Sequence, residues 1–256
     1  MIYLSVIIPS YNEAENIRRG VLAEVRDFLK KQDFSWEVIV SDDGSPDKES
    51  RKLAQDFCKA NPGFRFLDNE HAGKPFAVWS GIQEARGEIV LFTDMDQSTP
   101  LTEIKKLLPY FHEGYDIVIG SRGLERKKSS LFRRLASMIF REFRRSVLLT
   151  EIIDTQAGFK AFRSEVAREI FPLLAIMRAP REKTVGWKVT SFDVELLVAG
   201  EMRGYKIVEV PVSWEDRDVS RGKSRSTIKF IDESLEMVNE VIRVKFNQLR
   251  GFYSRK

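Results

Sequence analysis

The sequence predicts an α/β protein with three layers, in which helices cover both faces of a mostly parallel central sheet. Short apolar runs of strand-like composition alternate along the chain with longer segments of helical pattern. These runs are apolar on both faces, as expected for strands buried between two layers of helices. No internal repeat or low-complexity linker interrupts the chain, so no second independent domain is expected.

The expected elements follow one another in regular order. Strands are expected at residues 3–9, 36–43, 64–67, 88–94 and 116–120. The helices between them are expected to begin at Glu13, Pro46, Gly73 and Leu101. The stretch GFKAF, at residues 158–162, and the segment 205–214 are expected to add later strands to the same sheet.

The last part of the chain has a different pattern. Apolar residues recur there at steps of three and four, which is typical of a long amphipathic helix. They are Ile228, Ile231, Leu235, Val238, Ile242 and Leu249. We therefore expect residues 1–225 to form the α/β domain and residues 226–256 to form an amphipathic helix with a basic tail.

Composition limits the class of protein. A chain of 256 residues with 43% hydrophobic residues can bury a sizeable core, which excludes a disordered protein. The longest run without a charge covers the first twelve residues, whereas a membrane-spanning helix needs about 20 apolar residues. That run also lacks the basic start of a signal peptide. The single cysteine, Cys58, fits a reducing compartment, so a cytoplasmic location is expected.

Positive charge is concentrated in one segment. The formal net charge is +4, but residues 122–145 hold nine Lys and Arg against Glu125 and Glu142, a local balance of +7. The rest of the chain therefore carries −3. Such a cluster suits a phosphate-rich partner, which is an anionic membrane, a nucleic acid or a phosphorylated substrate.

The segments that follow the expected strands are rich in polar residues. They read PSYNE at residues 9–13, SDDGSPD at 41–47 and TDMDQSTP at 93–100. In open parallel sheets, ligands bind beyond the carboxyl ends of the strands, so these segments mark the expected site. None has the glycine pattern of a dinucleotide-binding loop or a Walker loop, which disfavours NAD-dependent dehydrogenases and Walker-type NTPases.

Two acids, Asp94 and Asp96, end the fourth strand-like run with one residue between them. Side chains two residues apart on an extended chain point the same way, so these carboxylates are expected to converge. Their repulsion is removed by a hard divalent cation such as Mg²⁺ or Mn²⁺, which substrate phosphates commonly help to hold. The alternative is that Asp94 caps the strand and Asp96 begins a turn.

Seven motifs together resemble the family 2 glycosyltransferases of GT-A fold, and especially the synthases that move one sugar onto dolichyl or polyprenyl phosphate. The resemblance covers about residues 3–230, and the motifs occur in the order of the family. They are SVIIPSYNE, VSDDGSPD, the GK of Gly73 and Lys74, ARGEIVLFTDMD, GSR at residues 120–122, DTQAGFKAF at 154–162 and SFDVELL at 191–197.

The resemblance implies roles for the residues that match these motifs. The nucleotide pocket would be formed by Pro9, Tyr11, Glu13 and Asp42. The metal that bridges the donor diphosphate would be held by Asp94 and Asp96, with Lys74 and Arg122 near the phosphates. The alternative readings are that Tyr11 shapes a turn, that Glu13 supports the first helical turn, and that Lys74 is a solvated residue at a helix start.

The segment at residues 154–162 resembles the glucosyltransferase branch more than the mannose synthases. The resemblance therefore implies glucose from UDP-glucose, with Asp154 and Gln156 at the sugar or at the acceptor end of the cleft. The alternative donor is GDP-mannose. Mannose synthases commonly have a glutamine four positions after the first metal aspartate, whereas this chain has Gln97 at the third, so the resemblance defines no third ligand.

A basic loop at residues 214–226 resembles the flexible loop of the family. Arg221, Lys223 and Arg225 would fold over a diphosphate or an acceptor phosphate and add charge-assisted hydrogen bonds. The alternative is a solvated surface loop whose charges offset those of nearby acids. His71, His112 and Cys58 lie in no pattern typical of metal ligands or nucleophiles and receive no role.

The expected reaction is the metal-dependent transfer of one hexose to a polyprenyl phosphate, with inversion as the family resemblance implies. A phosphate acceptor is already ionised and needs no strong base, since its second pKa is about 6. A sugar hydroxyl acceptor would need a carboxylate base, for which Asp154, Asp193 and Glu195 are the candidates. A different class remains as an alternative, namely a non-catalytic basic module that binds membranes or nucleic acid; for the enzyme, no nucleic acid partner is expected.

Membrane contact is expected at residues 127–149, on the cytoplasmic face. Apolar residues there fall on one helical face and arginines surround it, as in helices that lie in a membrane interface. The apolar residues are Phe132, Leu135, Ala136, Ile139, Phe143 and Val147. The C-terminal helix is a candidate for a second contact, and the alternative for residues 127–149 is a helix packed on the sheet.

Overall fold

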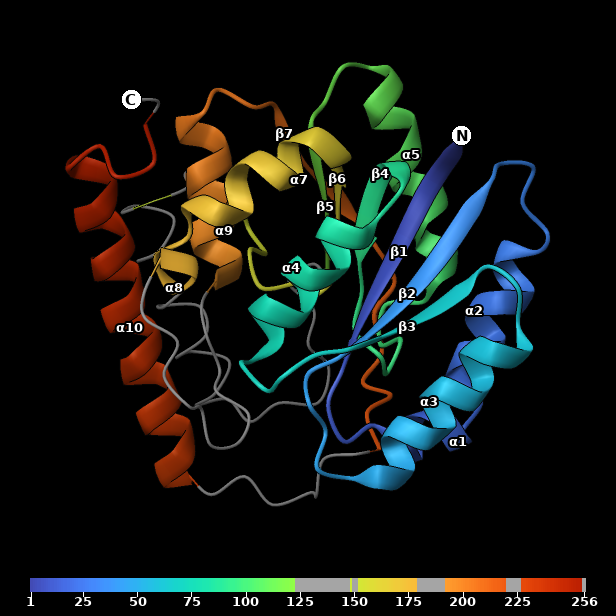
Figure 1. Cartoon of the computed structure of the whole chain (residues 1–256). Coiled ribbons are helices and arrows are strands. Elements are labelled where there is room, and N and C mark those ends of the chain that lie inside the picture. Colours follow the sequence, from blue (N-terminus) through green and yellow to red (C-terminus); the bar gives the residue numbers. More distant parts are fainter. Residues whose placement is uncertain (123–147, 149–151, 179–191, 220–226, 255–256) are drawn as a thin grey trace.

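A computed structural model describes the fold of residues 1–122, 148, 152–178, 192–219 and 227–254. Figure 1 shows a central sheet with helices on both sides and the long helix α10 along one flank. None of the helices in these ranges is both long enough and apolar enough to cross a membrane.

Seven strands form one sheet in the order β3-β2-β1-β4-β6-β5-β7. Strand β6 runs antiparallel to both of its neighbours, β4 and β5, and the other neighbouring pairs are parallel. The mostly parallel sheet expected from the sequence is therefore confirmed. The strands are β1 (Ile2–Ser10), β2 (Trp36–Asp42), β3 (Phe64–Asp68), β4 (Gly87–Phe92), β5 (Ile117–Ser121), β6 (Lys160–Arg163) and β7 (Ile207–Pro211).

Helices cover each face of the sheet, with a separate apolar core on each side. One core lies under α1 (Ala14–Arg18), α2 (Val21–Leu29), α3 (Lys48–Ala60) and α5 (Ile104–His112), which follows the 3₁₀ turn η1 (Leu101–Glu103). The other lies under α4 (Lys74–Glu84), α7 (Ser164–Ile170), the turn η2 (Phe171–Leu173), α8 (Ala175–Arg178), α9 (Phe192–Met202) and α10 (Thr227–Leu249). The strands are apolar on both faces because both faces are buried, which confirms the three-layer arrangement.

The helices begin within three residues of the positions expected from the sequence, with one difference in form. The first expected helix is split, because Gly20 adopts a left-handed φ of 91° between α1 and α2. Glycine takes this conformation without the steric penalty of a side chain. The last strand is also shorter than the apolar segment that predicts it, since β7 ends at Pro211.

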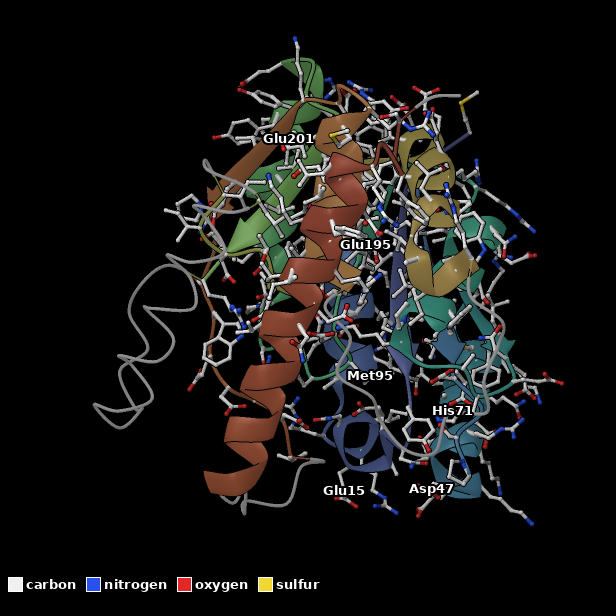
Figure 2. All side chains as sticks on the ribbon, turned by 90° about the vertical axis from the view of Figure 1, so that its left-hand side faces the viewer. Glu15, Asp47, His71, Met95, Glu195 and Glu201 are labelled. Carbon is white, nitrogen blue, oxygen red and sulfur yellow. The ribbon has the colours of Figure 1, made fainter. Side chains whose placement is uncertain are left out.

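Helix α10 packs into the same core as the sheet. Val241 and Val244 are buried in the core cluster that contains α9. The fully buried carboxylate of Glu195, on α9, accepts a hydrogen bond from the Tyr253 hydroxyl at 2.7 Å. Arg243 of α10 lies 3.3 Å from the other oxygen of the same carboxylate. Figure 2 shows α10 at the front of this side of the molecule.

The topology gathers the candidate residues at one edge. Strands β1, β2, β4, β5 and β7 are parallel, so their carboxyl ends meet at the lower edge in Figure 1. Because β6 runs the other way, the segment before it also arrives at this edge. We refer to it below as the carboxyl edge.

Candidate functional site

The loops after β1 and β2 are tied to each other by hydrogen bonds. Asn12 has a left-handed φ of 57°, and its backbone N–H donates to the Ser45 hydroxyl at 2.9 Å. Its side-chain oxygen accepts from the Asp47 backbone N–H at 3.2 Å. The Glu13 backbone N–H donates to the Ser50 hydroxyl at 2.8 Å. The two loops therefore form one rigid wall at the carboxyl edge, beside the buried Pro9.

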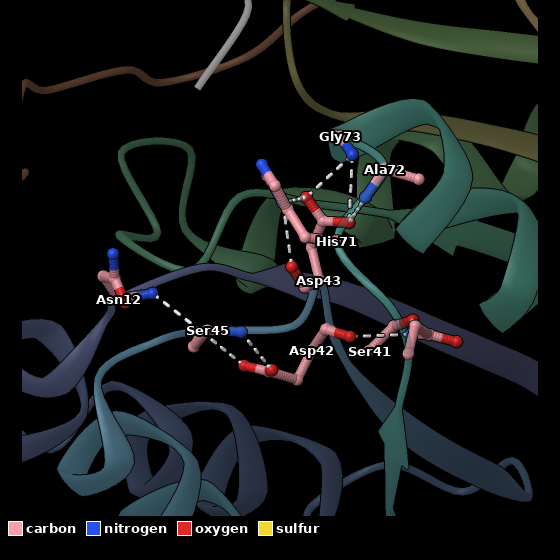
Figure 3. A network of polar contacts seen from close by, with 9 residues as sticks. Asn12, Ser41, Asp42, Asp43, Ser45, His71, Ala72 and Gly73 are labelled. Carbon is pink, nitrogen blue, oxygen red and sulfur yellow. Dashed lines mark hydrogen bonds and ion pairs between the residues drawn. The ribbon is translucent and has the colours of Figure 1, made fainter. Parts of the chain in front are cut away.

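The neighbouring acids Asp42 and Asp43 hold different loops. The buried carboxylate of Asp42 accepts from the Ser45 hydroxyl at 2.6 Å and from its backbone N–H at 2.8 Å. Burial raises the pKa of Asp42, and the bonds from Ser45 oppose this rise. Asp43 accepts from the backbone N–H groups of Ala72 and Gly73, both at 2.9 Å (Figure 3). The second acid of the SDDG motif thus fixes the loop before α4.

Tyr11 stacks on His71, a residue that the sequence does not mark as functional. Their ring centroids are 4.6 Å apart and the planes are inclined by 21°. His71 Nδ1 lies 2.9 Å from Asp43 Oδ2, which orients the ring. His71 Nε2 is buried and has no hydrogen-bond partner among the described residues. The stack places a flat aromatic surface at the carboxyl edge.

Glu13 lies in an acidic environment that opposes its ionisation. Burial raises the pKa of its carboxyl to about 7, the hydrogen bond from Asn16 lowers it, and Asp218, Asp96 and Asp94 raise it further. The Asn16 side-chain nitrogen bridges the acids, since it lies 2.6 Å from Glu13 Oε2 and 3.2 Å from Asp218 Oδ1. Four acids from three parts of the chain therefore face one small region.

Asp94 and Asp96 lie in a turn and not on an extended strand. Strand β4 ends at Phe92. Gln97 has a left-handed φ of 50°, and its backbone N–H donates to the Asp94 carbonyl at 3.2 Å. Met95 between the acids is buried in the core. The two acids are close, as expected, but the extended geometry from which we predicted their closeness is wrong.

The electrostatics of this turn suit a divalent cation. Burial and then the charge of Asp94 raise the pKa of Asp96, so ionising Asp96 beside Asp94 is unfavourable. A hard divalent cation removes this penalty. Within the described residues, no group of three or more His, Cys, Asp or Glu side chains is placed to hold a metal ion. The residues fit a metal that two carboxylates hold and a ligand completes.

Two residues from other elements fix the position of Asp94. Lys74, at the start of α4, places its Nζ 2.5 Å from Asp94 Oδ1. Burial lowers the pKa of Lys74, but Asp94 and Asp193 outweigh burial and the net pKa is raised, so the amine stays charged. Opposite, a Cβ added to Gly158 would lie 2.1 Å from Asp94 Oδ2. Only glycine leaves room for the carboxylate here.

Arg122 and Asp154 form a bidentate ion pair on the other half of the edge. Arg122 Nε and its terminal nitrogen each lie 2.7 Å from one Asp154 oxygen, and the Arg122 backbone N–H donates to the same carboxylate at 3.0 Å. Burial raises the pKa of Asp154, but the contacts with Arg122 outweigh it and lower the pKa to about 2. The Trp214 ring covers the guanidinium at 5.9 Å.

A second ion pair lies deeper. The fully buried Lys160 places its Nζ 2.7 Å from Asp193 Oδ1. Burial lowers the pKa of Lys160, and the charge of Asp193 only partly offsets this. Of the three carboxylates considered as bases, Asp154 and Asp193 are therefore each paired with a cation, and Glu195 is fully buried against Tyr253.

Several expected residues cannot be compared with the structure. Arg221, Lys223 and Arg225, and the segment 127–149 except for residue 148, lie outside the described residues. Gln156 is half-buried in the segment before β6. The described stem of the basic loop crosses the carboxyl edge, where the Glu215 backbone N–H donates to the Ser98 carbonyl at 2.8 Å. This bond holds the start of the basic loop beside the turn that contains Asp94 and Asp96.

Comparison with known proteins gives consistent matches. Residues 5–171 match the family described as Glycosyl transferase family 2. The chain is 33% identical to a dolichyl-phosphate beta-glucosyltransferase of Dictyostelium discoideum, over 100% of this chain and 77% of that protein. It is also 33% identical to the dolichyl-phosphate beta-glucosyltransferase of Homo sapiens, over 85% of this chain and 69% of that protein.

A solved structure supports the architecture. Glucosyl-3-phosphoglycerate synthase from Mycobacterium tuberculosis, in complex with Mn²⁺, uridine diphosphate and glucosyl-3-phosphoglycerate, aligns with a TM-score of 0.63 at 20% sequence identity. The alignment covers 96% of this chain and 80% of that one. The likeness concerns the fold and confirms the GT-A arrangement expected from the sequence.

Proposed function

Since the chain belongs to glycosyl transferase family 2, we propose that this glycosyltransferase moves one glucose from UDP-glucose to dolichyl or another polyprenyl phosphate. The observation that carries the proposal is the match to a dolichyl-phosphate beta-glucosyltransferase at 33% identity over the whole chain. Transfer proceeds with inversion in this proposal. The arrangement of charge at the carboxyl edge supports the proposed reaction on chemical grounds.

The donor nucleotide binds on the β1–β4 half of the edge, where β1, β2 and β4 end. The Tyr11 ring, held against His71, offers a surface on which a base can stack. Glu13 accepts hydrogen bonds from the base or ribose, while Pro9 and the buried Asp42 shape the wall behind them. Lys74 lies beside Asp94 and reaches the diphosphate as a point charge.

Asp94 and Asp96 hold Mg²⁺ or Mn²⁺ in this proposal, and the structural relative from Mycobacterium tuberculosis contains Mn²⁺ with uridine diphosphate. The metal supplies charge stabilisation to the diphosphate as negative charge develops on the leaving oxygen. The chain positions the two carboxylates by burying Met95 between them and by keeping residue 158 without a side chain.

The acceptor phosphate approaches the β5–β6 half. Arg122, oriented by its bidentate contact with Asp154, faces the phosphates, and Gln156 lies in the same segment as Asp154. Arg221, Lys223 and Arg225 of the basic loop add charge-assisted hydrogen bonds when substrate is bound. No carboxylate base is needed, which agrees with the pairing of Asp154 and Asp193 to cations.

The enzyme works as a peripheral protein on the cytoplasmic face of a membrane, because its acceptor is a lipid. Residues 127–149 supply one contact through their apolar stripe and arginines.

Donor choice tests the proposal. Titration calorimetry with UDP-glucose, UDP-N-acetylglucosamine and GDP-mannose, each with and without Mn²⁺, should show metal-dependent binding that is tightest for UDP-glucose. Radiolabelled UDP-glucose should then label a polyprenyl phosphate more efficiently than GDP-mannose does. A clear preference for GDP-mannose would replace glucose by mannose and leave the family unchanged. Transfer to a sugar hydroxyl but not to the lipid phosphate would refute the acceptor.

A further inference from the structure

The C-terminal half of α10 carries an apolar stripe that faces solvent. Its side chains are Ile242, Phe246 and Leu249, which are 53%, 50% and 74% exposed. Residues spaced by four and three positions share one face of a helix. Val241 and Val244, on another face of the same helix, are buried in the core. The helix therefore has a second apolar face that the described part of the protein does not cover.

Basic residues flank this stripe. The Arg250 guanidinium stacks on the Phe246 ring at 3.8 Å, and Arg243 and Lys245 lie on the two borders of the stripe. With successive residues rotated by about 100°, the acid Glu240 lies about 150° from the centre of the stripe. Glu240 is also paired with Arg243 at 2.6 Å. Arg243 is also paired with Glu195, so the positive charge beside the exposed apolar face comes from Lys245 and Arg250.

An open pocket rich in arginine adjoins the stripe. Arg178 stacks on the Phe252 ring at 4.3 Å. Arg203 has a buried Nε without a hydrogen-bond partner in the described structure, and one of its terminal nitrogens lies 3.4 Å from Glu169. The pocket is lined by Arg178, Arg203, Arg250, Gly251, Phe252 and Ser254. Three guanidinium groups around one opening suit a phosphate group, which arginine binds through several donors.

We propose that this surface, the α10 stripe with its arginine pocket, docks on an anionic lipid bilayer. The apolar side chains enter the boundary between headgroups and acyl chains, and the arginines contact lipid phosphates. A second copy of the chain is a poorer occupant, because a two-fold contact through this surface would bring its arginines together. The proposal deepens the proposed function and rests on it for the need of the enzyme to reach a lipid.

The position of α10 links this surface to the site. The helix begins at the carboxyl edge and runs along one flank of the molecule to the opposite edge (Figure 1). It follows the basic loop directly in the chain. The stripe and the pocket lie at the end of α10 that is remote from the carboxyl edge, so a bilayer that touches them reaches the acceptor half of the site only where it follows the whole outer side of the helix.

A fluorescent label tests the contact directly. Leu249→Cys carries an environment-sensitive fluorophore, and Lys52→Cys on the exposed side of α3 is the control. Cys58 is buried and its pKa is raised to about 12 by burial, so it reacts little. Vesicles of phosphatidylcholine with phosphatidylserine should shift the emission at position 249 to the blue and leave that at 52 unchanged. Equal responses at both positions, or none at 249, overturn the proposal.

Matched charge variants test the arginines. Arg178→Gln with Arg250→Gln removes two charges from the pocket, and Arg18→Gln with Arg51→Gln removes two charges from α1 and α3, away from the pocket. The pocket variant should bind anionic vesicles about 30-fold more weakly, and the control should change less than about threefold. Equal losses overturn the proposal. A doubled mass in light scattering without lipid, abolished by the pocket variant, assigns the surface to a second copy instead.

These measurements need no sugar donor, so they separate the two proposals. Glucosyl transfer to a short-chain polyprenyl phosphate in detergent should be unchanged in the pocket variant. Vesicle binding without transfer in the parent protein would remove the proposed function and keep the bilayer surface. Transfer without vesicle binding would keep the proposed function and overturn the bilayer surface.

Discussion

The two halves of the carboxyl edge shift the pKa values of their acids in opposite directions. On the β1–β4 half, burial and neighbouring acids raise the pKa values of Glu13 and Asp96. On the β5–β6 half, Asp154 is held by Arg122 and its pKa is lowered to about 2, and Asp193 lies 2.7 Å from Lys160. In the first half Lys74 pairs with Asp94, while Glu13 and Asp96 form no ion pair among the described residues; in the second half both acids are paired with a cation.

This difference indicates what each half is prepared to bind. Repelling carboxylates are a strained arrangement that an external cation relaxes, so the first half is complementary to a metal and what the metal carries. An internally paired half leaves no strong base and presents arginine toward an incoming anion. Four predictions test this contrast.

The largest effect is expected from breaking the buried pair on the second half. Asp193→Asn leaves the Lys160 charge, which is fully buried, without its partner. The free energy of unfolding, measured by urea denaturation, should fall by about 3–5 kcal/mol. Adding Lys160→Met to the same variant should recover most of the loss. A loss below about 1 kcal/mol would mean that the pair is not a structural support.

Neutralising the metal carboxylates should affect activity and not folding. Asp94→Asn and Asp96→Asn should each lower glucosyl transfer more than a hundredfold, about 3 kcal/mol in the transition state. Asp96→Asn should not lower the melting temperature, since it removes a repulsion. Asp56→Asn, an exposed acid on α3, is the matched control. Near-normal transfer in either site variant would refute the metal assignment.

Glu13 should make the protein less stable as the pH rises. Its pKa is raised from 4.5 to about 7 on folding, so below pH 4.5 the carboxyl is protonated in both the folded and the unfolded state. As the pH rises from 4.5 to 7, ionisation favours the unfolded state and the free energy of unfolding falls. The loss is on the order of 2–3 kcal/mol. Without metal, in EDTA, urea denaturation between pH 4 and 8 should show this slope in the parent protein and not in Glu13→Gln. Identical slopes would contradict the acidic environment of Glu13.

Asp154 should make the protein less stable as the pH falls, and the change in the free energy of unfolding should be smaller than for Glu13. Its pKa is lowered from 3.8 to about 2, so it stabilises the fold above pH 3.8 and this contribution is lost as pH falls to 2. The loss is about 2 kcal/mol. Denaturation between pH 5 and 2 should be steeper in the parent than in Asp154→Asn. A variant that keeps the acid slope would assign that slope to other carboxyl groups.

Much of the fold could be predicted because it follows from local patterns. Strands buried on both faces are apolar throughout, and the alternation of strands with helices implies parallel neighbours. Since the carboxyl ends of parallel strands lie at one edge, the sequence also correctly predicts that the loops with Tyr11, Asp42 and Asp94 lie together. The direction and place of β6 could not be predicted, because the stretch KAF carries no sign of the strands that it separates.

The parts of the site that escaped prediction depend on contacts distant in sequence. His71 has no motif around it, and only the fold brings its ring onto Tyr11. The need for glycine at residue 158 arises from Asp94, which lies far along the chain. The closeness of Asp94 and Asp96 was predicted for the wrong reason, since a left-handed Gln97 makes the turn. Asparagine or glycine is the usual signal for that conformation.

The place of β6 also determines when the protein can be completed during synthesis. Strands β4 and β5 do not touch each other in the sheet, because β6 lies between them although it is made after both. Until residue 163 has left the ribosome, the nascent chain exposes two unpaired strand edges with apolar faces. Such edges are sites of aggregation, so a chaperone that holds the first 122 residues should matter more here than in sheets built strand by strand.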